Sequence, residues 1–246
     1  MGYGKCGVSL RSANVICTEE LNKPAAKWGS VQYPIIIRFA LYYFLIYINF
    51  DSYGRGIRKI IIFANQYQRI IFHMHDYKDK LKNITTFIFD FDGVLSDGKI
   101  WVLPDGDQLR ATGVKDGYAL QYALRKGYRV AVISGGYSES MRLRYKNFPG
   151  MEIFLQVRNK LKVYNEYLDK YGLSREEVMM MGDDIPDYEI MQISGLKCCP
   201  ADAAEEIKAI ADYVSVKKGG DGAARDVIEQ TLKAQGRWFE KDACIW

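Results

Sequence analysis

Short apolar runs alternate with segments of helical spacing over most of the chain, from about residue 84 onward. The run at 85–89 is β-branched or aromatic throughout, as in a strand buried on both faces, and similar runs follow at 129–133 and 178–181. Strands alternating with helices predict an α/β fold with a Rossmann-like, doubly wound parallel sheet. The remaining elements that this pattern predicts are strands at 152–156, 196–199 and 213–216, and helices at 114–126, 138–146, 159–171, 187–193, 203–211 and 223–234.

One segment interrupts this alternation and predicts a β-hairpin. Residues 99–103 and 108–112 flank a Pro-Asp-Gly-Asp turn at 104–107. Its first strand is apolar, and an exposed ribbon of that kind risks pairing with other chains. We therefore expect the hairpin to be buried against copies of itself; the alternative is that it packs on its own sheet. The aromatic C-terminal stretch at 236–246 could close over the functional site of its own or a neighbouring subunit, or could be a disordered tail.

Polar residues follow three of the predicted strands at the point where each one ends. Asp90 and Asp92 follow the first strand, Ser134 follows the second, and Asp183 follows the strand at 178–181. In open α/β sheets, ligands bind outside the carboxyl ends of the strands, so these side chains are expected in one crevice. Lys160 lies at the start of a predicted helix, where free backbone N–H groups would also meet a ligand phosphate.

The paired aspartates carry the most informative chemistry. Asp90 and Asp92 would point to the same side of a strand, and like charges so close need a cation or a shared proton. Mg²⁺ is often held by one or two carboxylates together with a substrate phosphate. One aspartate could form an aspartyl-phosphate, with the other as general acid and base. The alternative is that these residues have no catalytic role. The paired aspartates would then lie in a solvated turn, Ser134 in an ordinary loop and Lys160 at the surface, and Asp183 would cap a helix.

The order and strand context of these motifs resemble the haloacid dehalogenase-like superfamily of phosphohydrolases. Asp90-Phe-Asp92-Gly-Val looks like its first motif, Ser134 its second, Lys160 its third, and the Gly-Asp-Asp-Ile-Pro-Asp run at 182–187 its fourth. The resemblance implies that Asp90 is the nucleophile and Asp92 the general acid and base. It implies that Ser134 and Lys160 bind the transferred phosphoryl group.

The resemblance also implies a metal site. Mg²⁺ would be bound by Asp90, by the main-chain carbonyl of Asp92 and by Asp183. Asp187 would support either the metal shell or Lys160. Phosphoryl transfer depends more on alignment and charge neutralisation than on covalent chemistry by the protein, which suits this division of roles.

Motif spacing identifies the capless subclass of that superfamily. The stretch from Asp90 to Ser134 has room only for the hairpin and one helix, and the stretch from Ser134 to Lys160 only for one helix and a short strand. Neither can hold a cap domain. In similar proteins the hairpin builds a homotetramer and a neighbouring subunit covers the active site, so the resemblance implies the same assembly here.

Within this subclass, the runs at 114–118 and 219–226 resemble phosphatases that act on eight-carbon sugar-acid phosphates in lipopolysaccharide precursor synthesis. Arg144 lies where that group carries an arginine for the substrate, and a guanidinium suits a carboxylate or phosphate. Lys115 and Gln156 depart from the usual Arg and Gly. The alternatives are a phosphatase for nine-carbon sugar-acid 9-phosphates, a phosphomutase, and a non-catalytic oligomeric module.

Composition narrows the range of mechanisms. Both histidines, His73 and His75, precede the first strand, which nearly excludes Ser-His-Asp, Cys-His and His-ligated zinc sites in the main body. The five cysteines are odd in number and lack metal-site spacing, which fits a reducing cytoplasm. The net charge of +4 comes from residues 1–73, which hold nine Lys or Arg against three Asp or Glu; the rest holds 25 against 27. Nucleic-acid binding is therefore not expected.

Residues 1–73 do not share the orderly pattern of the rest. The segment 34–50 is apolar and aromatic, close to the length of a membrane span, with Arg38 inside it. Three interpretations of this stretch are open. It is an artefact of an upstream start codon, with Met74 as the true start, or a membrane anchor, or a small accessory region. We favour the first, because pattern, caps and turns do not agree here. We expect a disordered or artefactual extension at 1–73 and a phosphatase domain at 74–246, with membrane attachment only through 34–50.

Overall fold

The computed structural model describes residues 77–245. The predictions made for residues 1–73, including the apolar segment at 34–50, lie outside the described residues. Among residues 77–245, no helix combines the length and apolar composition that crossing a membrane requires.

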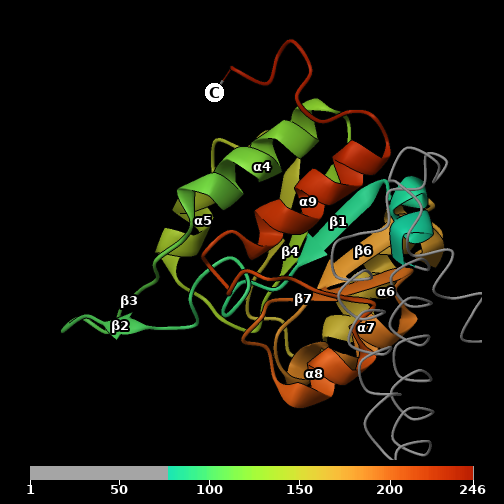
Figure 1. The fold of residues 1–246 in the computed structure, drawn as a ribbon. Coiled ribbons are helices and arrows are strands. Elements are labelled where there is room, and N and C mark those ends of the chain that lie inside the picture. The colour runs from blue at the N-terminus through green and yellow to red at the C-terminus, as the bar shows by residue number, and fades with distance from the viewer. Residues whose placement is uncertain (1–76, 246) are drawn as a thin grey trace, which may run out of the picture. The chain divides into compact units, whose positions relative to one another are not determined.

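A six-stranded parallel sheet organises the described residues (Figure 1). Its order is β5-β4-β1-β6-β7-β8, and every neighbouring pair is parallel. This confirms the predicted α/β, doubly wound fold without a cap domain. The strands are β1 (Thr86–Phe89), β4 (Arg129–Ile133), β5 (Met151–Phe154), β6 (Val178–Met181), β7 (Leu196–Cys199) and β8 (Tyr213–Val214).

Helices cover both faces of the sheet, which explains why the central strands are apolar without interruption. Alternate side chains of β1 point to opposite faces, so Phe87 and Phe89 join one core cluster and Ile88 joins the other. The first face is covered by α4 (Val114–Arg125), α5 (Glu139–Tyr145) and α9 (Ala223–Ala234), and the second by α6 (Lys160–Tyr171), α7 (Tyr188–Ile193) and α8 (Glu205–Ile210).

The hairpin is present but shorter than predicted. Its strands are β2 (Trp101–Val102) and β3 (Gln108–Leu109), paired antiparallel with Trp101 opposite Leu109. Figure 1 shows this ribbon extending away from the sheet. Trp101 is 69% and Val102 70% exposed, so the described part of the chain leaves most of the ribbon uncovered.

A short helical segment precedes the first strand. Residues 77–80 are helical and continue into a 3-10 turn, η2 (Leu81–Asn83). Tyr77 and Leu81 enter the core, and the Tyr77 hydroxyl donates to Gln230 Oε1 of α9 at 3.0 Å. Two more 3-10 turns follow along the chain: η3 (Arg175–Glu177) precedes β6, and η4 (Ile185–Asp187) precedes α7. These segments are too short for a helical period to be recognised in the sequence.

The glycine-rich run before α9 packs tightly against the loop after β1. A Cβ on Gly219 would lie 1.8 Å from the carbonyl oxygen of Gly93, so only glycine fits there. Gly220 donates its N–H to the carbonyl of Val94 at 2.9 Å. The buried carboxylate of Asp116 accepts from the N–H of Gly222 and of Arg225 at the start of α9. This run therefore supports the loop that carries the paired aspartates.

The C-terminal segment packs on α4. The ring of Trp238 lies edge-on to Tyr118 and Tyr122, and Lys126 forms ion pairs with Glu240 and Asp242. Through Ala243 the segment is therefore an ordered part of the α4 face, which differs from the disordered-tail alternative.

Candidate active site

The central strand brings the predicted motifs together. Because β1 lies between β4 and β6, the loops that follow these three strands meet at the same edge of the sheet. They carry Asp90 and Asp92, Ser134 and Asp183. Asp90 also donates its backbone N–H to the carbonyl of Met181 at 3.0 Å, which ties the first loop to the end of β6.

A buried ammonium group lies among the carboxylates. Lys160, at the first position of α6, has Nζ 3.0 Å from Asp90 Oδ1 and 2.7 Å from Asp187 Oδ1. Asp187 Oδ2 in turn accepts from the backbone N–H of Asp183 at 3.2 Å. Asp187 thus contacts both Lys160 and the loop of Asp183.

Three carboxylates form a cluster of the kind that holds a divalent cation. One oxygen each of Asp90, Asp183 and Asp187, called the acidic trio below, lies within 4.8 Å of the others. Among the described residues, the buried Oδ1 of Asp183 has no hydrogen-bond partner, whereas Oδ1 of Asp90 forms an ion pair with Lys160 at 3.0 Å. Buried polar atoms are normally satisfied, and Mg²⁺ binds carboxylate oxygens. The donor set therefore fits Mg²⁺.

Burial and mutual repulsion disfavour ionisation of these carboxylates in the metal-free protein. Burial, with the charge of Asp187, raises the pKa of Asp90 to about 7. Burial, with the charge of Asp90, raises the pKa of Asp183 to about 8. Burial also raises the pKa of Asp187. Burial disfavours the charged form of Lys160, but Asp90 and Asp187 outweigh it and raise the pKa of this ammonium group.

These shifts predict a pH-dependent effect of Mg²⁺ on stability. An aspartate whose pKa is raised by folding opposes folding once it ionises, so the metal-free protein should lose this contribution as pH rises from about 4 to about 8. Because Mg²⁺ binds the ionised form, it should raise the unfolding temperature more at about pH 8 than at about pH 5.5. Calorimetry in EDTA and in Mg²⁺ at each pH measures this difference. Asp183→Asn should reduce it, whereas an equal Mg²⁺ effect at both pH values would contradict the prediction.

Ser134 lies in a loop with two cross-connections. Its buried hydroxyl oxygen accepts from the N–H of Gly136 at 3.1 Å. The backbone N–H groups of Gln156 and Val157 donate to the carbonyls of Gly136 and Ser134. Gln156 has a φ of 57°, in the left-handed region that glycine adopts most readily. The loop of Ser134 is thereby held against the connection between β5 and α6.

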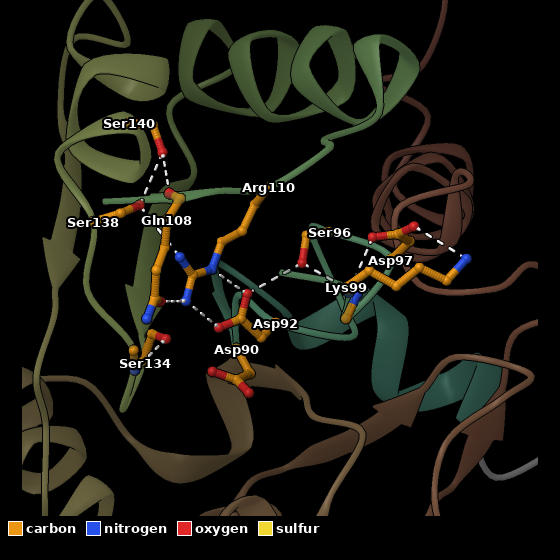
Figure 2. A network of polar contacts seen from close by, with 12 residues as sticks. Asp90, Asp92, Ser96, Asp97, Lys99, Gln108, Arg110, Ser134, Ser138 and Ser140 are labelled. Carbon is orange, nitrogen blue, oxygen red and sulfur yellow. Dashed lines mark hydrogen bonds and ion pairs between the residues drawn. The ribbon is translucent and has the colours of Figure 1, made fainter. Parts of the chain in front are cut away.

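The carboxylate of Asp92 pairs with Arg110, a residue that the sequence pattern did not single out. Figure 2 shows the guanidinium of Arg110 facing the carboxylate of Asp92. Nε lies 2.6 Å from Oδ1 and Nη2 3.0 Å from Oδ2, a two-pronged ion pair. Arg110 immediately follows β3 of the hairpin. Its only signal in the sequence was a positive charge in a predicted ribbon, which is usually solvated.

Arg144 has other neighbours. Its Nε donates to the hydroxyl of Thr112 at 3.1 Å, and its guanidinium lies over the rings of Tyr145 and Phe148. Within residues 77–245, no hydrogen bond or ion pair joins it to the trio or to Asp92. Its assignment to the substrate stays a prediction.

The site combines a carboxylate nucleophile candidate, a buried ammonium group, a serine hydroxyl and a cluster of carboxylates that fits a cation. Such a set suits transfer of a phosphoryl group, whose oxygens need cationic partners and whose phosphorus needs an aligned nucleophile.

Comparison with known proteins agrees with this chemistry. A family profile described as haloacid dehalogenase-like hydrolase matches residues 137–226. The 3-deoxy-D-manno-octulosonate 8-phosphate phosphatase of Salmonella typhi is 37% identical over 161 residues, which are 65% of this chain and 86% of that protein. The Escherichia coli strain B enzyme of the same name is 36% identical over 165 residues, 67% of this chain and 88% of that protein.

A solved structure of a phosphatase with the same name is also similar to this chain in three dimensions. The Moraxella catarrhalis 3-deoxy-D-manno-octulosonate 8-phosphate phosphatase, crystallised with a magnesium ion, a phosphate ion and a KDO molecule, is 33% identical with a TM-score of 0.65. The match covers 68% of this chain and 95% of that one. The chain therefore belongs to the haloacid dehalogenase-like hydrolases, in the family of the 3-deoxy-D-manno-octulosonate 8-phosphate phosphatases.

Proposed function

We propose that this protein is a Mg²⁺-dependent phosphatase that hydrolyses 3-deoxy-D-manno-octulosonate 8-phosphate to the free sugar acid and phosphate. The observation that carries the proposal is the buried Asp90–Lys160–Asp187 cluster at the carboxyl end of β1. It occurs in a chain 37% identical to a phosphatase for that substrate. The product is a precursor of lipopolysaccharide.

In the proposed mechanism, Asp90 attacks phosphorus as the bond to the sugar oxygen breaks, and Asp92 gives that oxygen a proton. Water then attacks the aspartyl-phosphate while Asp92 takes its proton, which releases phosphate and restores Asp90. Lys160 and Ser134 bind the oxygens of the phosphoryl group. Mg²⁺, held by Asp90, the main-chain carbonyl of Asp92 and Asp183, would supply charge neutralisation, and Asp187 supports Lys160 and the Asp183 loop.

Phosphate release from a panel of sugar phosphates, measured with Mg²⁺, tests this function. We expect the highest kcat/KM for the eight-carbon 8-phosphate. The nine-carbon alternatives, KDN and sialic acid 9-phosphates, belong in the same assay, and a higher kcat/KM for either would replace the proposed substrate. A phosphomutase would need a way to retain its intermediate without a cap. A non-catalytic module would release no phosphate from any member of the panel.

We further propose that the protein is a homotetramer in which hairpins pack together beside the active sites. Four apolar side chains of this ribbon are exposed: Ile100, Trp101, Val102 and Leu109. A contiguous exposed apolar ribbon favours burial in an interface. Leu103, in contrast, is half-buried already.

Charged substitutions in the hairpin test the assembly. Trp101→Glu and Val102→Glu should dissociate the tetramer, because each places a charge in the proposed interface. Dissociation should raise KM for the sugar phosphate more than for a small aryl phosphate, since a neighbouring subunit would contact only the larger substrate. Light scattering and kinetics measure both effects, with Val216→Glu as a control at an exposed apolar position. A monomeric parent protein with undiminished selectivity would contradict the proposal.

A chain that starts at Met74 should fold and turn over substrate like the full chain. It keeps Tyr77 and Leu81, which pack into the core, and every candidate site residue. Thermal unfolding and kcat of the two proteins provide the comparison. A chain starting at Ile84 should unfold at a lower temperature, because it lacks both core residues. Failure of the Met74 chain to fold would show that residues 1–73 complete the domain.

We also propose a cytoplasmic location. Among the described cysteines, Cys198 and Cys199 are buried, Cys244 is exposed, and all three are free thiols. Free thiols are typical of a reducing compartment. Fractionation of cells that express the native gene would test this, and recovery in the membrane fraction would instead support an anchor at 34–50.

A further inference from the structure

The ion pair between Arg110 and Asp92 joins the hairpin to the proposed proton-transfer group. The side chain of Arg110 is only 2% exposed, whereas that of Asp92 is 28% exposed. A buried guanidinium needs partners, and Asp92 is the only carboxylate among residues 77–245 with which it pairs. The side chain of Asp92 is therefore partly open to solvent, whereas the Arg110 side chain that pairs with it is buried.

Both oxygens of Asp92 are held in place. Oδ1 accepts from Arg110 Nε at 2.6 Å and from the Ser96 hydroxyl at 3.2 Å, while Oδ2 accepts from Arg110 Nη2 at 3.0 Å. A fork with two parallel hydrogen bonds fixes the plane of a carboxylate as well as its position. Proton transfer depends steeply on such geometry, because the acid must lie within hydrogen-bond reach of the leaving oxygen.

Arg110 is itself held by the hairpin root and by the start of α5. Its guanidinium donates to Gln108 Oε1 at 3.1 Å and to the Ser138 hydroxyl at 3.3 Å (Figure 2). The Ser140 hydroxyl donates to the backbone carbonyl of Gln108 at 3.3 Å. A continuous polar network thus runs from β3 and α5 to Asp92.

The loop of Ser134 leaves room for this arrangement. A Cβ at Gly136 would lie 2.9 Å from Asp92 Oδ2 and 3.1 Å from Arg110 Nη2. Contacts this short would force the neighbours to move, so the absence of a side chain lets the fork reach Asp92 beside Ser134. The pairing is therefore built from three separate segments of the chain.

We propose that Arg110 is a positioning residue that orients Asp92 for both proton transfers, and that it makes the placement of the hairpin a condition for catalysis. The inference rests on the proposed phosphatase function. Arg110 acts through Asp92 and forms no bond to phosphorus in either step. The two-pronged geometry, rather than positive charge alone, is what the role requires.

Two substrates separate this role from substrate binding. The leaving group of p-nitrophenyl phosphate departs without a proton, so formation of its aspartyl-phosphate depends little on Asp92. Hydrolysis of that intermediate still needs Asp92 as base. Arg110→Gln should therefore release one enzyme equivalent of p-nitrophenol rapidly and then turn over slowly. With the sugar 8-phosphate, kcat should fall at least about tenfold and by no more than the about 10²–10⁴-fold that general acid–base catalysis itself contributes.

A double-mutant cycle tests whether Arg110 acts through Asp92. In an Asp92→Asn background, Arg110→Gln should lower kcat by less than about threefold further, because the orientation it provides is no longer used. Arg110→Lys keeps the charge without the fork and should recover only part of kcat. Arg142→Gln, on the exposed side of α5, serves as the matched arginine control and should keep wild-type kinetics.

Four results would overturn the inference. Unchanged kcat in Arg110→Gln would exclude positioning, and a raised KM for the sugar phosphate alone would make Arg110 a substrate ligand. A raised kcat would make it a restraint on Asp92, and full additivity in the cycle would place its effect elsewhere. If circular dichroism shows that Arg110→Gln does not fold, the double-mutant cycle is measured with Arg110→Lys, alone and combined with Asp92→Asn. Failure of the wild-type protein to hydrolyse either substrate would instead overturn the proposed function.

Discussion

Asp90→Asn should abolish phosphate release from every substrate in the panel. An amide cannot form the aspartyl-phosphate, and it is a poor ligand for Mg²⁺, so both the nucleophile and one metal ligand are lost. Removal of Mg²⁺ with EDTA should abolish turnover as well. Steady-state phosphate release, with radiolabelled substrate to detect a trapped intermediate, measures the outcome.

The folded state of this variant should remain intact. The pKa of the buried Asp90 carboxylate is raised to about 7 even though Lys160 lies beside it, so on balance a neutral group removes an unfavourable buried charge, and Lys160 keeps Asp187 as its anionic partner. The metal-free variant should therefore unfold at or above the temperature of the metal-free parent at neutral pH. Asp169→Asn, an exposed position on α6, is the matched control and should change neither activity nor stability. Full activity of Asp90→Asn, or full activity in EDTA, would show that the mechanism is wrong.

Asp92→Asn should lower turnover of the sugar phosphate by about 10²–10⁴-fold, the usual contribution of general acid–base catalysis. Its amide can neither protonate the leaving sugar oxygen nor take a proton from water. The loss in the first step should be smaller for p-nitrophenyl phosphate, whose leaving group needs no proton. Rapid-quench kinetics on both substrates measure the two steps separately.

The variant also leaves the buried guanidinium of Arg110 without its anionic partner. Some loss of stability is therefore expected, and kinetics should be measured well below the unfolding midpoint of the variant. If Asp92→Asn turned over an alkyl phosphate at close to the wild-type rate, Asp92 would not be the proton-transfer group.

Local sequence determined most of the architecture. The uninterrupted apolar run before Asp90 predicted a strand buried on both faces, and β1 occupies the centre of the sheet. Helix ends were also well predicted where a local cap exists. Asn159 accepts from the N–H of Lys162 at the start of α6, and Gly172 adopts the left-handed conformation at its end. Gly127, with a φ of 81°, follows α4 in the same way.

The convergence of the motifs could also be predicted, because it follows from topology. Parallel strands joined by helices place all their carboxyl ends at one edge, so Asp90, Ser134 and Asp183 had to approach one another once the strands were identified. Lys160 joins them because α6 follows β5 and therefore begins at the same edge of the sheet. The roles assigned to these residues remain predictions, and their proximity is a finding.

Only the tertiary structure decided which charged groups pair within that crevice. Nothing in the local sequence shows that Lys160 contacts both Asp90 and Asp187, or that Asp92 turns toward Arg110. Arg144, which resemblance assigned to the substrate, lies instead against Thr112 and two aromatic rings. The strands, helices and caps were determined by the sequence itself, because backbone conformation responds to neighbouring residues. The pairing of charges needed the folded structure, because it depends on the path of the hairpin and on burial, which bring together side chains distant along the chain.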